Sequence, residues 1–207
     1  MLRARDTRHA LKPFVLADIF LHELDTFMQH AERQIDQIRR RVLDGQSIAH
    51  HEKVFSLFQP HTEWISKGKA GVPVELGLRV CVVEDQHRFI VHHRVMEKLT
   101  DDAIAVSIVE QTQQRFGALH SVSLDKGFHS AGNQDRLKAL ADVVVMPRKG
   151  KLSAVNRGQA SDPEFIRLRQ QHSAGESAIN ALEVHGLDVC PDHGIVGFKR
   201  YVALAVV

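Results

Sequence analysis

The sequence predicts an α/β fold in which helices flank a mixed β-sheet. The chain has 207 residues, of which 43% are hydrophobic and 25% charged, as in a globular protein with a packed core. After a helical N-terminal part, two apolar runs are joined by a polar turn, and helical and strand-like segments then alternate. Strands separated by a helix usually run parallel, so this order predicts an antiparallel hairpin followed by parallel strands.

The first fifty residues predict a helical segment that either covers a sheet or reaches a partner chain. Residues 1–13 are basic and show no periodicity, so we expect an irregular lead-in. Over 14–43, apolar residues recur every three or four positions, which predicts one long amphipathic helix or two shorter ones. We therefore predict an N-terminal helical segment over 1–50 and a second domain over 51–207.

The hairpin and its approach occupy the next part of the chain. Residues 54–58 are expected to form a short strand that ends at Pro60. Residues 74–83 alternate and then become continuously apolar, as a strand entering a core does. Residues 88–96 are expected to return beside them, which gives an antiparallel pair.

Helices and strands alternate after the hairpin. We expect a helix that begins near Thr100 and ends at Gly117, followed by a strand that ends at Asp125. The remaining expected elements are a short helix over 133–141, a buried strand over 143–146, a helix over 162–185 and a final helix from about residue 193.

Two carboxylates in this pattern are candidates for catalysis. Asp125 is predicted to lie at the carboxyl end of a strand, where α/β folds place their chemistry. Glu176 lies in a helical pattern beside an apolar face. Each also has an ordinary explanation, as a turn Asp that caps a helix and as an exposed helical Glu. Together they match two of the three parts of a two-metal phosphoryl-transfer site, because Mg²⁺ and Mn²⁺ prefer hard oxygen ligands.

Basic residues are clustered although the formal net charge is only +2. The clusters are either solvated faces or sites of phosphate contact, and phosphate contact would make nucleic-acid binding depend on salt. Their members are Arg3, Arg5, Arg8 and Lys12, then Arg33, Arg39, Arg40 and Arg41, then Arg148, Lys149, Lys151 and Arg157.

The sequence also predicts the compartment. The N-terminus is charged and lacks the apolar segment of a signal peptide, and no apolar run is long enough to span a membrane. The two cysteines lie in or beside apolar runs, which indicates a reducing compartment. We therefore expect a soluble, cytoplasmic protein without a membrane partner.

Three separated segments resemble a known family, the DDE transposases of bacterial insertion sequences. The segment Ser-Leu-Asp125-Lys-Gly-Phe-His-Ser resembles the motif around the second Asp of those enzymes, and Ala-Gly-Glu176-Ser-Ala-Ile-Asn-Ala-Leu resembles their Glu helix. The block over 58–77 resembles the approach to their second strand. The similarity extends from about residue 50 to the end of the chain, and the segments occur in the expected order.

The resemblance implies a ribonuclease-H-like fold and metal-dependent DNA cleavage and strand transfer at the ends of an insertion sequence. It implies that Asp125 and Glu176 are ligands of Mg²⁺ or Mn²⁺. It also implies a homo-oligomer in the full-length form and a nucleoid-associated location in a bacterium. The residues expected to contact DNA are Lys126, Arg148, Lys149, Lys151, Arg167 and Arg169.

This sequence departs from the family pattern at two places. Family members often carry Arg four residues before the Glu and Lys seven after it, where this chain has His172 and Glu183. The family also places a first Asp on a first strand, before a helical insertion that 14–43 resemble. We therefore expect that strand to lie upstream of Met1, and the chain to be a C-terminal piece with impaired activity. The alternatives are a non-catalytic DNA-binding or dimerising remnant, and a nuclease for RNA or DNA junctions.

Overall fold

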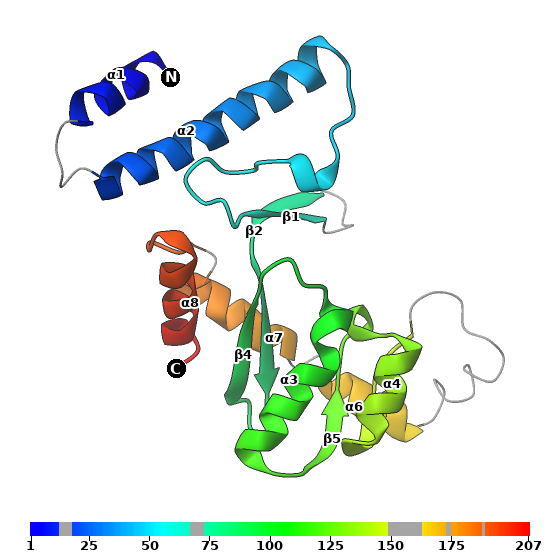
Figure 1. Ribbon diagram of the computed structural model, residues 1–207. Coiled ribbons are helices and arrows are strands. Elements are labelled where there is room, and N and C mark those ends of the chain that lie inside the picture. Colours follow the sequence, from blue (N-terminus) through cyan, green and yellow to red (C-terminus); the bar gives the residue numbers. More distant parts are fainter. Residues whose placement is uncertain (13–17, 67–72, 149–162, 173–174, 188) are drawn as a thin grey trace. The chain divides into compact units, whose positions relative to one another are not determined.

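The computed structural model shows a mixed α/β protein divided into two compact units, Met1–Leu78 and Arg79–Val207. The structure describes residues 1–12, 18–66, 73–148, 163–172, 175–187 and 189–207, without the side chains of 164 and 171–178. The first unit contains the N-terminal helices and the residues up to 78. The second contains the hairpin and the alternating helices and strands (Figure 1).

Two helices dominate the first unit. Helix α2 (Asp18–Ile38) continues into one wider turn, η2 (Arg39–Leu43), as the apolar periodicity predicts. Helix α1 (Leu2–Leu11) replaces the irregular lead-in that we expected for residues 1–13, so that expectation was wrong for its described part. Its basic side chains pair with acidic ones on α2: Arg5 with Glu32 at 2.8 Å, and Arg8 with Asp25.

Residues 54–58 do not form the strand that we predicted. After a short 3-10 turn, η3 (His50–Glu52), they pack on α2 instead: the Val54 N–H donates to Gln37 Oε1 at 2.5 Å, and the Phe58 ring contacts Phe27 with centroids 5.3 Å apart. The nearby strand is β1 (Glu63–Ser66), which pairs antiparallel with β2 (Val74–Gly77). The predicted strand over 74–83 therefore divides, and its first half belongs to the first unit.

The second unit begins with the predicted hairpin. Strands β3 (Arg79–Glu84) and β4 (Ile90–Met96) pair antiparallel. Asp85 forms the turn, because its Oδ1 accepts the backbone N–H groups of His87 at 2.8 Å and Phe89 at 2.9 Å. Such self-capping by Asp is a common way to stabilise a turn.

A parallel β-α-β arrangement follows, as the sequence predicts. Helix α3 (Asp101–Phe116) ends at Gly117, whose φ of 85° is reached without the strain that a side chain would cause. Strands β5 (Leu119–Ser123) and β6 (Ala141–Val145) pair parallel, and α4 (Ala131–Lys138) connects them. The core of this unit includes Met96, Ile104, Ile108, Leu124 and Leu137.

The described strands form three two-stranded sheets instead of the one mixed sheet that we predicted. In the second unit, the hairpin lies on one side of α3 and β5 lies on the other (Figure 1). The sheets remain separate because no described strand bridges β3 and β5. Helix α3 joins them through buried contacts with residues of both sheets.

The C-terminal part is helical. The single helix expected over 162–185 is divided into α6 (Pro163–His172), α7 (Gly175–Leu182) and a wider turn, η5 (Glu183–Leu187). Gly186 ends this run at a φ of 101°, and the Tyr201 hydroxyl donates to its carbonyl at 2.7 Å. Helix α8 (Gly194–Ala205) confirms the predicted final helix, and Val202 on it is fully buried.

Candidate functional site

The structure places Asp125 two residues beyond the end of β5, close to the strand end at which the sequence predicted it. Leu124 is buried, and its N–H donates to the carbonyl of Val145 at 2.8 Å, so the parallel pairing extends to the residue before Asp125. Asp125 is exposed and caps the short 3-10 helix η4 (Lys126–Phe128), its Oδ1 accepting the Lys126 N–H at 2.6 Å. The ordinary role as a helix cap is therefore present. The carboxylate nevertheless faces solvent at the carboxyl end of a parallel strand.

Asn133 fixes the loop that carries Asp125. Its side-chain amide donates to the carbonyl of Phe128 at 3.0 Å and to the carbonyl of Asp102 at 2.7 Å. Its backbone N–H donates to Ser130 Oγ at 3.1 Å, which caps α4. One side chain on α4 thereby links η4 to the start of α3. The loop is held on a packed framework, and such support lets a site keep its geometry.

Asp101 is a second carboxylate at this end of the unit, and our sequence reasoning assigned it no functional role. A Cβ on Gly127 would lie 2.6 Å from Asp101 Oδ2, so Gly127 leaves room for that carboxylate beside the loop. Arg79 Nη1 lies 3.7 Å from Asp101 Oδ1. Burial, with a smaller contribution from the Asp101 charge, raises the pKa of the Cys81 thiol to about 12. In the sequence, the only local feature that could have pointed to Asp101 was the Asp101-Asp102 pair at the start of a helix.

Two buried polar atoms that flank Asp125 in the sequence lack hydrogen-bond partners among the described residues. Ser123 Oγ and His129 Nε2 are each inaccessible to solvent and form no hydrogen bond. A buried polar atom without a partner is unfavourable, so such atoms often mark a place where a water or ligand completes the hydrogen bonding. The carboxylates of Asp125 and Asp101 are hard oxygen donors of the kind that Mg²⁺ and Mn²⁺ prefer.

The other predicted ligand is only partly described. Glu176 lies on α7, but its side chain is outside the described residues, so its relation to Asp125 stays a prediction. Helix α6, which precedes α7, packs near β5 and β6. Among the described His, Cys, Asp and Glu side chains, no three form a metal-binding group.

Four of the six residues that we expected to contact DNA are described, and all four are exposed. Lys126 lies directly after Asp125, and Arg148 follows β6 by three residues. Arg167 and Arg169 lie on α6. Lys149 and Lys151 are outside the described residues. The exposed cations are thus on the loop after β5, on the segment after β6 and on the helix that contacts both strands.

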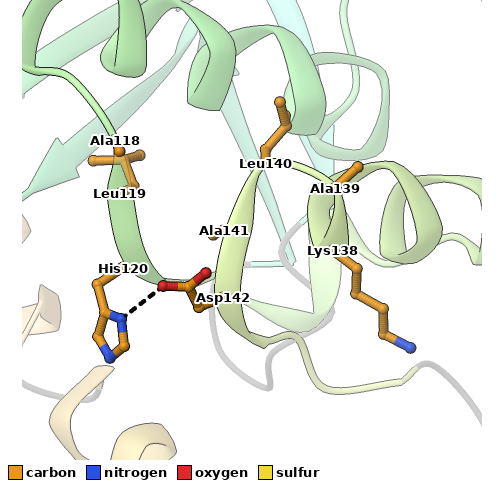
Figure 2. A pocket seen from close by; sticks show the side chains of 8 residues that line it. All are labelled: Ala118, Leu119, His120, Lys138, Ala139, Leu140, Ala141 and Asp142. Carbon is orange, nitrogen blue, oxygen red and sulfur yellow. Dashed lines mark hydrogen bonds and ion pairs between the residues drawn. The ribbon is translucent and has the colours of Figure 1, made fainter.

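A hollow of about 300 Å³ lies at the opposite end of β5 and β6 (Figure 2). The imidazole of His120 points to Asp142, with Nδ1 and Oδ2 2.9 Å apart, while Lys138 points away from that pair. The two paired side chains are 80% and 78% exposed, so solvent screens their interaction. The hollow begins at the amino ends of the strands and is separate from the Asp125 loop.

Comparisons with known proteins give no family assignment. No family model, no curated protein and no solved structure matches the chain. Within the described part of the chain, none of the helices combines the length and the apolar composition needed to cross a membrane.

Proposed function

We propose that the chain carries the catalytic domain of a DDE-type transposase, in a form that lacks one metal ligand and is impaired when isolated. The observation that carries the proposal is an exposed Asp125 at the carboxyl end of a parallel strand, on a loop that Asn133 holds against two helices. The sequence around it resembles the second-Asp motif of that family. Cleavage and rejoining of DNA at insertion-sequence ends is the corresponding reaction.

The order of elements supports a ribonuclease-H-like assignment. The hairpin β3–β4, helix α3 and the parallel strands β5 and β6 follow one another as expected for that fold. In the proposed complete fold, a first strand would lie between β3 and β5 and would join the two sheets of the second unit into one. That strand would also supply the missing Asp.

The residues of this chain have defined roles in the proposed reaction. Asp125 and Glu176 would hold Mg²⁺ or Mn²⁺, which when bound stabilises the attacking and leaving oxygens of a phosphodiester. Lys126 is next to Asp125 and would contact a DNA phosphate. Arg167 and Arg169 would attract the duplex electrostatically, because each adds one positive charge to α6.

A nicking assay tests the catalytic role of Asp125. The 207-residue chain would be incubated with supercoiled plasmid and Mn²⁺ or Mg²⁺, with EDTA as the blank. We expect weak, metal-dependent nicking that Asp125→Asn reduces at least about tenfold, a loss typical of removing a group that acts in the transition state. Asp142→Asn is the matched control, because Asp142 is an exposed carboxylate at the other end of the same sheet.

Three outcomes would contradict this proposal. Equal nicking by the Asp125→Asn and Asp142→Asn variants would remove Asp125 from the reaction. Robust multiple turnover by the unmodified chain would show that no essential ligand is missing. Absence of nicking, together with an Mn²⁺ affinity that Asp125→Asn leaves unchanged, would remove the metal site.

The second candidate is a non-catalytic remnant that binds DNA, and the exposed Lys126, Arg148, Arg167 and Arg169 favour it. It predicts DNA binding without divalent metal. If all four side chains contact phosphates, log K should fall against log salt with a slope of about −3.6, since each contact contributes about −0.9. Arg167→Ala should lower that slope by about one contact. A binding constant that does not respond to salt would exclude this candidate.

A further inference from the structure

An apolar stripe runs along α2 and the turn η2 that continues it, and the stripe is open at both ends. It consists of Phe20, Leu24, Phe27, Ile35, Ile38 and Val42, with Ala31 at its centre. Successive members are separated by four, three, four, four, three and four residues, so they share one face of the helix. Phe20, Ile35, Ile38 and Val42 are 66%, 53%, 57% and 70% exposed.

Contacts within the first unit border this stripe without covering its ends. Helix α1 pairs with Asp25 and Glu32, which are seven residues apart and occupy another side of α2. On the opposite border, His30 Nδ1 lies 3.4 Å from the Leu57 carbonyl, and the Phe58 ring contacts Phe27. In the middle of the stripe Leu24, Phe27 and Ala31 are half-buried, whereas the apolar side chains at its two ends are exposed. Exposed apolar side chains gathered on one face of a helix are typical of an interaction surface.

The spacing of the stripe indicates what covers it. The series reads the same in both directions from Ala31, so a second α2 running antiparallel would present the same pattern to the first. In that arrangement Phe20 of each copy faces Val42 of the other, and Leu24 faces Ile38. The small side chain of Ala31 lies where the two-fold axis crosses, which lets the helices approach closely.

The charges beside the stripe favour the same orientation. Glu23 lies on α2 and Arg41 on the turn η2 that continues it; their spacing of eighteen residues is about five helical turns, so they border the stripe on one side. Both side chains are exposed. Antiparallel packing about Ala31 brings Glu23 of each copy near Arg41 of the other, whereas parallel packing would leave Glu23 of one copy and Arg41 of the other at opposite ends of the helix pair. Opposite charges beside an apolar seam are a known determinant of helix orientation.

We infer that α2 is a self-association element, through which two copies of this chain form an antiparallel, two-fold symmetric helix pair centred on Ala31. The interface is isologous, so it closes at the dimer and leaves no free apolar end. This inference does not depend on the proposed catalytic role of Asp125, because every residue that it uses belongs to the first unit.

Sedimentation equilibrium of the full chain tests the association. We expect a reversible monomer–dimer equilibrium, which Ile38→Asp weakens about a hundredfold because two buried charges then face apolar partners. Ile19→Asp is the matched control: Ile19 is 80% exposed on the same helix but lies off the stripe. Circular dichroism would show that both variants keep their helices. Equal dissociation constants for the two variants would overturn the inference.

Charge reversal and cross-linking test the orientation. Glu23→Arg and Arg41→Glu should each weaken the dimer, and the double variant should restore it. In a chain with Cys81→Ala and Cys190→Ser, Ala31→Cys should form a disulfide with itself. Phe20→Cys should cross-link only when mixed with Val42→Cys. Self-cross-linking of Phe20→Cys would show a parallel pair. A monomer at every concentration, with Phe20 protected in footprinting, would show that another part of the same chain covers the stripe. Either result would refute the antiparallel dimer.

Discussion

Asn133 is the residue whose removal best tests how the Asp125 loop is held. Asn133→Ala keeps the backbone N–H that donates to Ser130 Oγ, and removes only the side-chain amide. Two carbonyl groups, those of Phe128 and Asp102, then lose a hydrogen-bond donor. We therefore expect loss of stability in the second unit and greater mobility of the loop between β5 and α4.

The size of this effect follows from the contacts. Each lost hydrogen bond is worth about 0.5–1.5 kcal/mol, so two amount to roughly 2 kcal/mol. Alanine is a better helix former than asparagine by roughly 0.5 kcal/mol, which offsets part of the loss. The free energy of unfolding should therefore fall by about 1.5 kcal/mol. For a unit of this size, the midpoint of thermal unfolding should fall by about 6 °C.

Two measurements check this prediction. Circular dichroism at 222 nm gives the unfolding midpoint, and hydrogen exchange gives the local opening of residues 124–134. Asp135→Ala is the control, because Asp135 is exposed on the same helix and a surface change there should stay within about 0.5 kcal/mol. If Asn133→Ala matched Asp135→Ala in both measurements, the loop would not depend on Asn133, and the reasoning would fail.

Three further predictions concern the second unit. Leu137→Ala should cost about 2–5 kcal/mol in urea unfolding, since Leu137 is 0% exposed. With its pKa at about 12, Cys81 is about one ten-thousandth thiolate at pH 8, so iodoacetamide should modify it far more slowly in the folded protein than in urea. The neutral Cys81 thiol contributes to the free energy of unfolding below its ordinary pKa, and this contribution should be lost as the pH rises from about 9 to 12. The pKa of Asp192 is lowered mainly by a hydrogen bond from Arg200 and then by one from the His193 N–H. Protonation of Asp192 as the pH falls below about 4 should therefore loosen α8, and the Asp192→Asn variant should show a smaller response to acid.

Helices and strands are predicted well from the sequence where their buried residues recur at the regular spacing of a helix or a strand. The apolar period of α2 and the β-α-β alternation of the second unit both appear where expected. Helix α1 was missed because its contacts with α2 are ion pairs between residues 17 and 27 positions apart, which leave no local period. Residues 54–58 have the composition of a strand, but contact with α2 determines their conformation instead.

From the sequence, the position of a candidate site residue could be predicted only where it is set by the strand that directly precedes that residue. Asp125 was placed correctly because a short apolar run ends just before it. Asp101 was not recognised, because its approach to the loop depends on Gly127, which is distant in sequence and acts by having no side chain. Asn133 was also missed, since an amide that links two carbonyls looks like any polar helical residue before the fold is known.

The separation of the two sheets in the second unit explains why these small contacts matter. A strand that is paired on both edges is held by its neighbours, but the described sheets of this unit have two strands each, so β3 and β5 are both edge strands. The position of Asp125 therefore depends on α3 and α4, through the buried Leu124 and Leu137 and through Asn133. If a further strand bridged β3 and β5, this dependence would decrease. The Asn133→Ala penalty should then be smaller in any longer form of the chain that supplies such a strand.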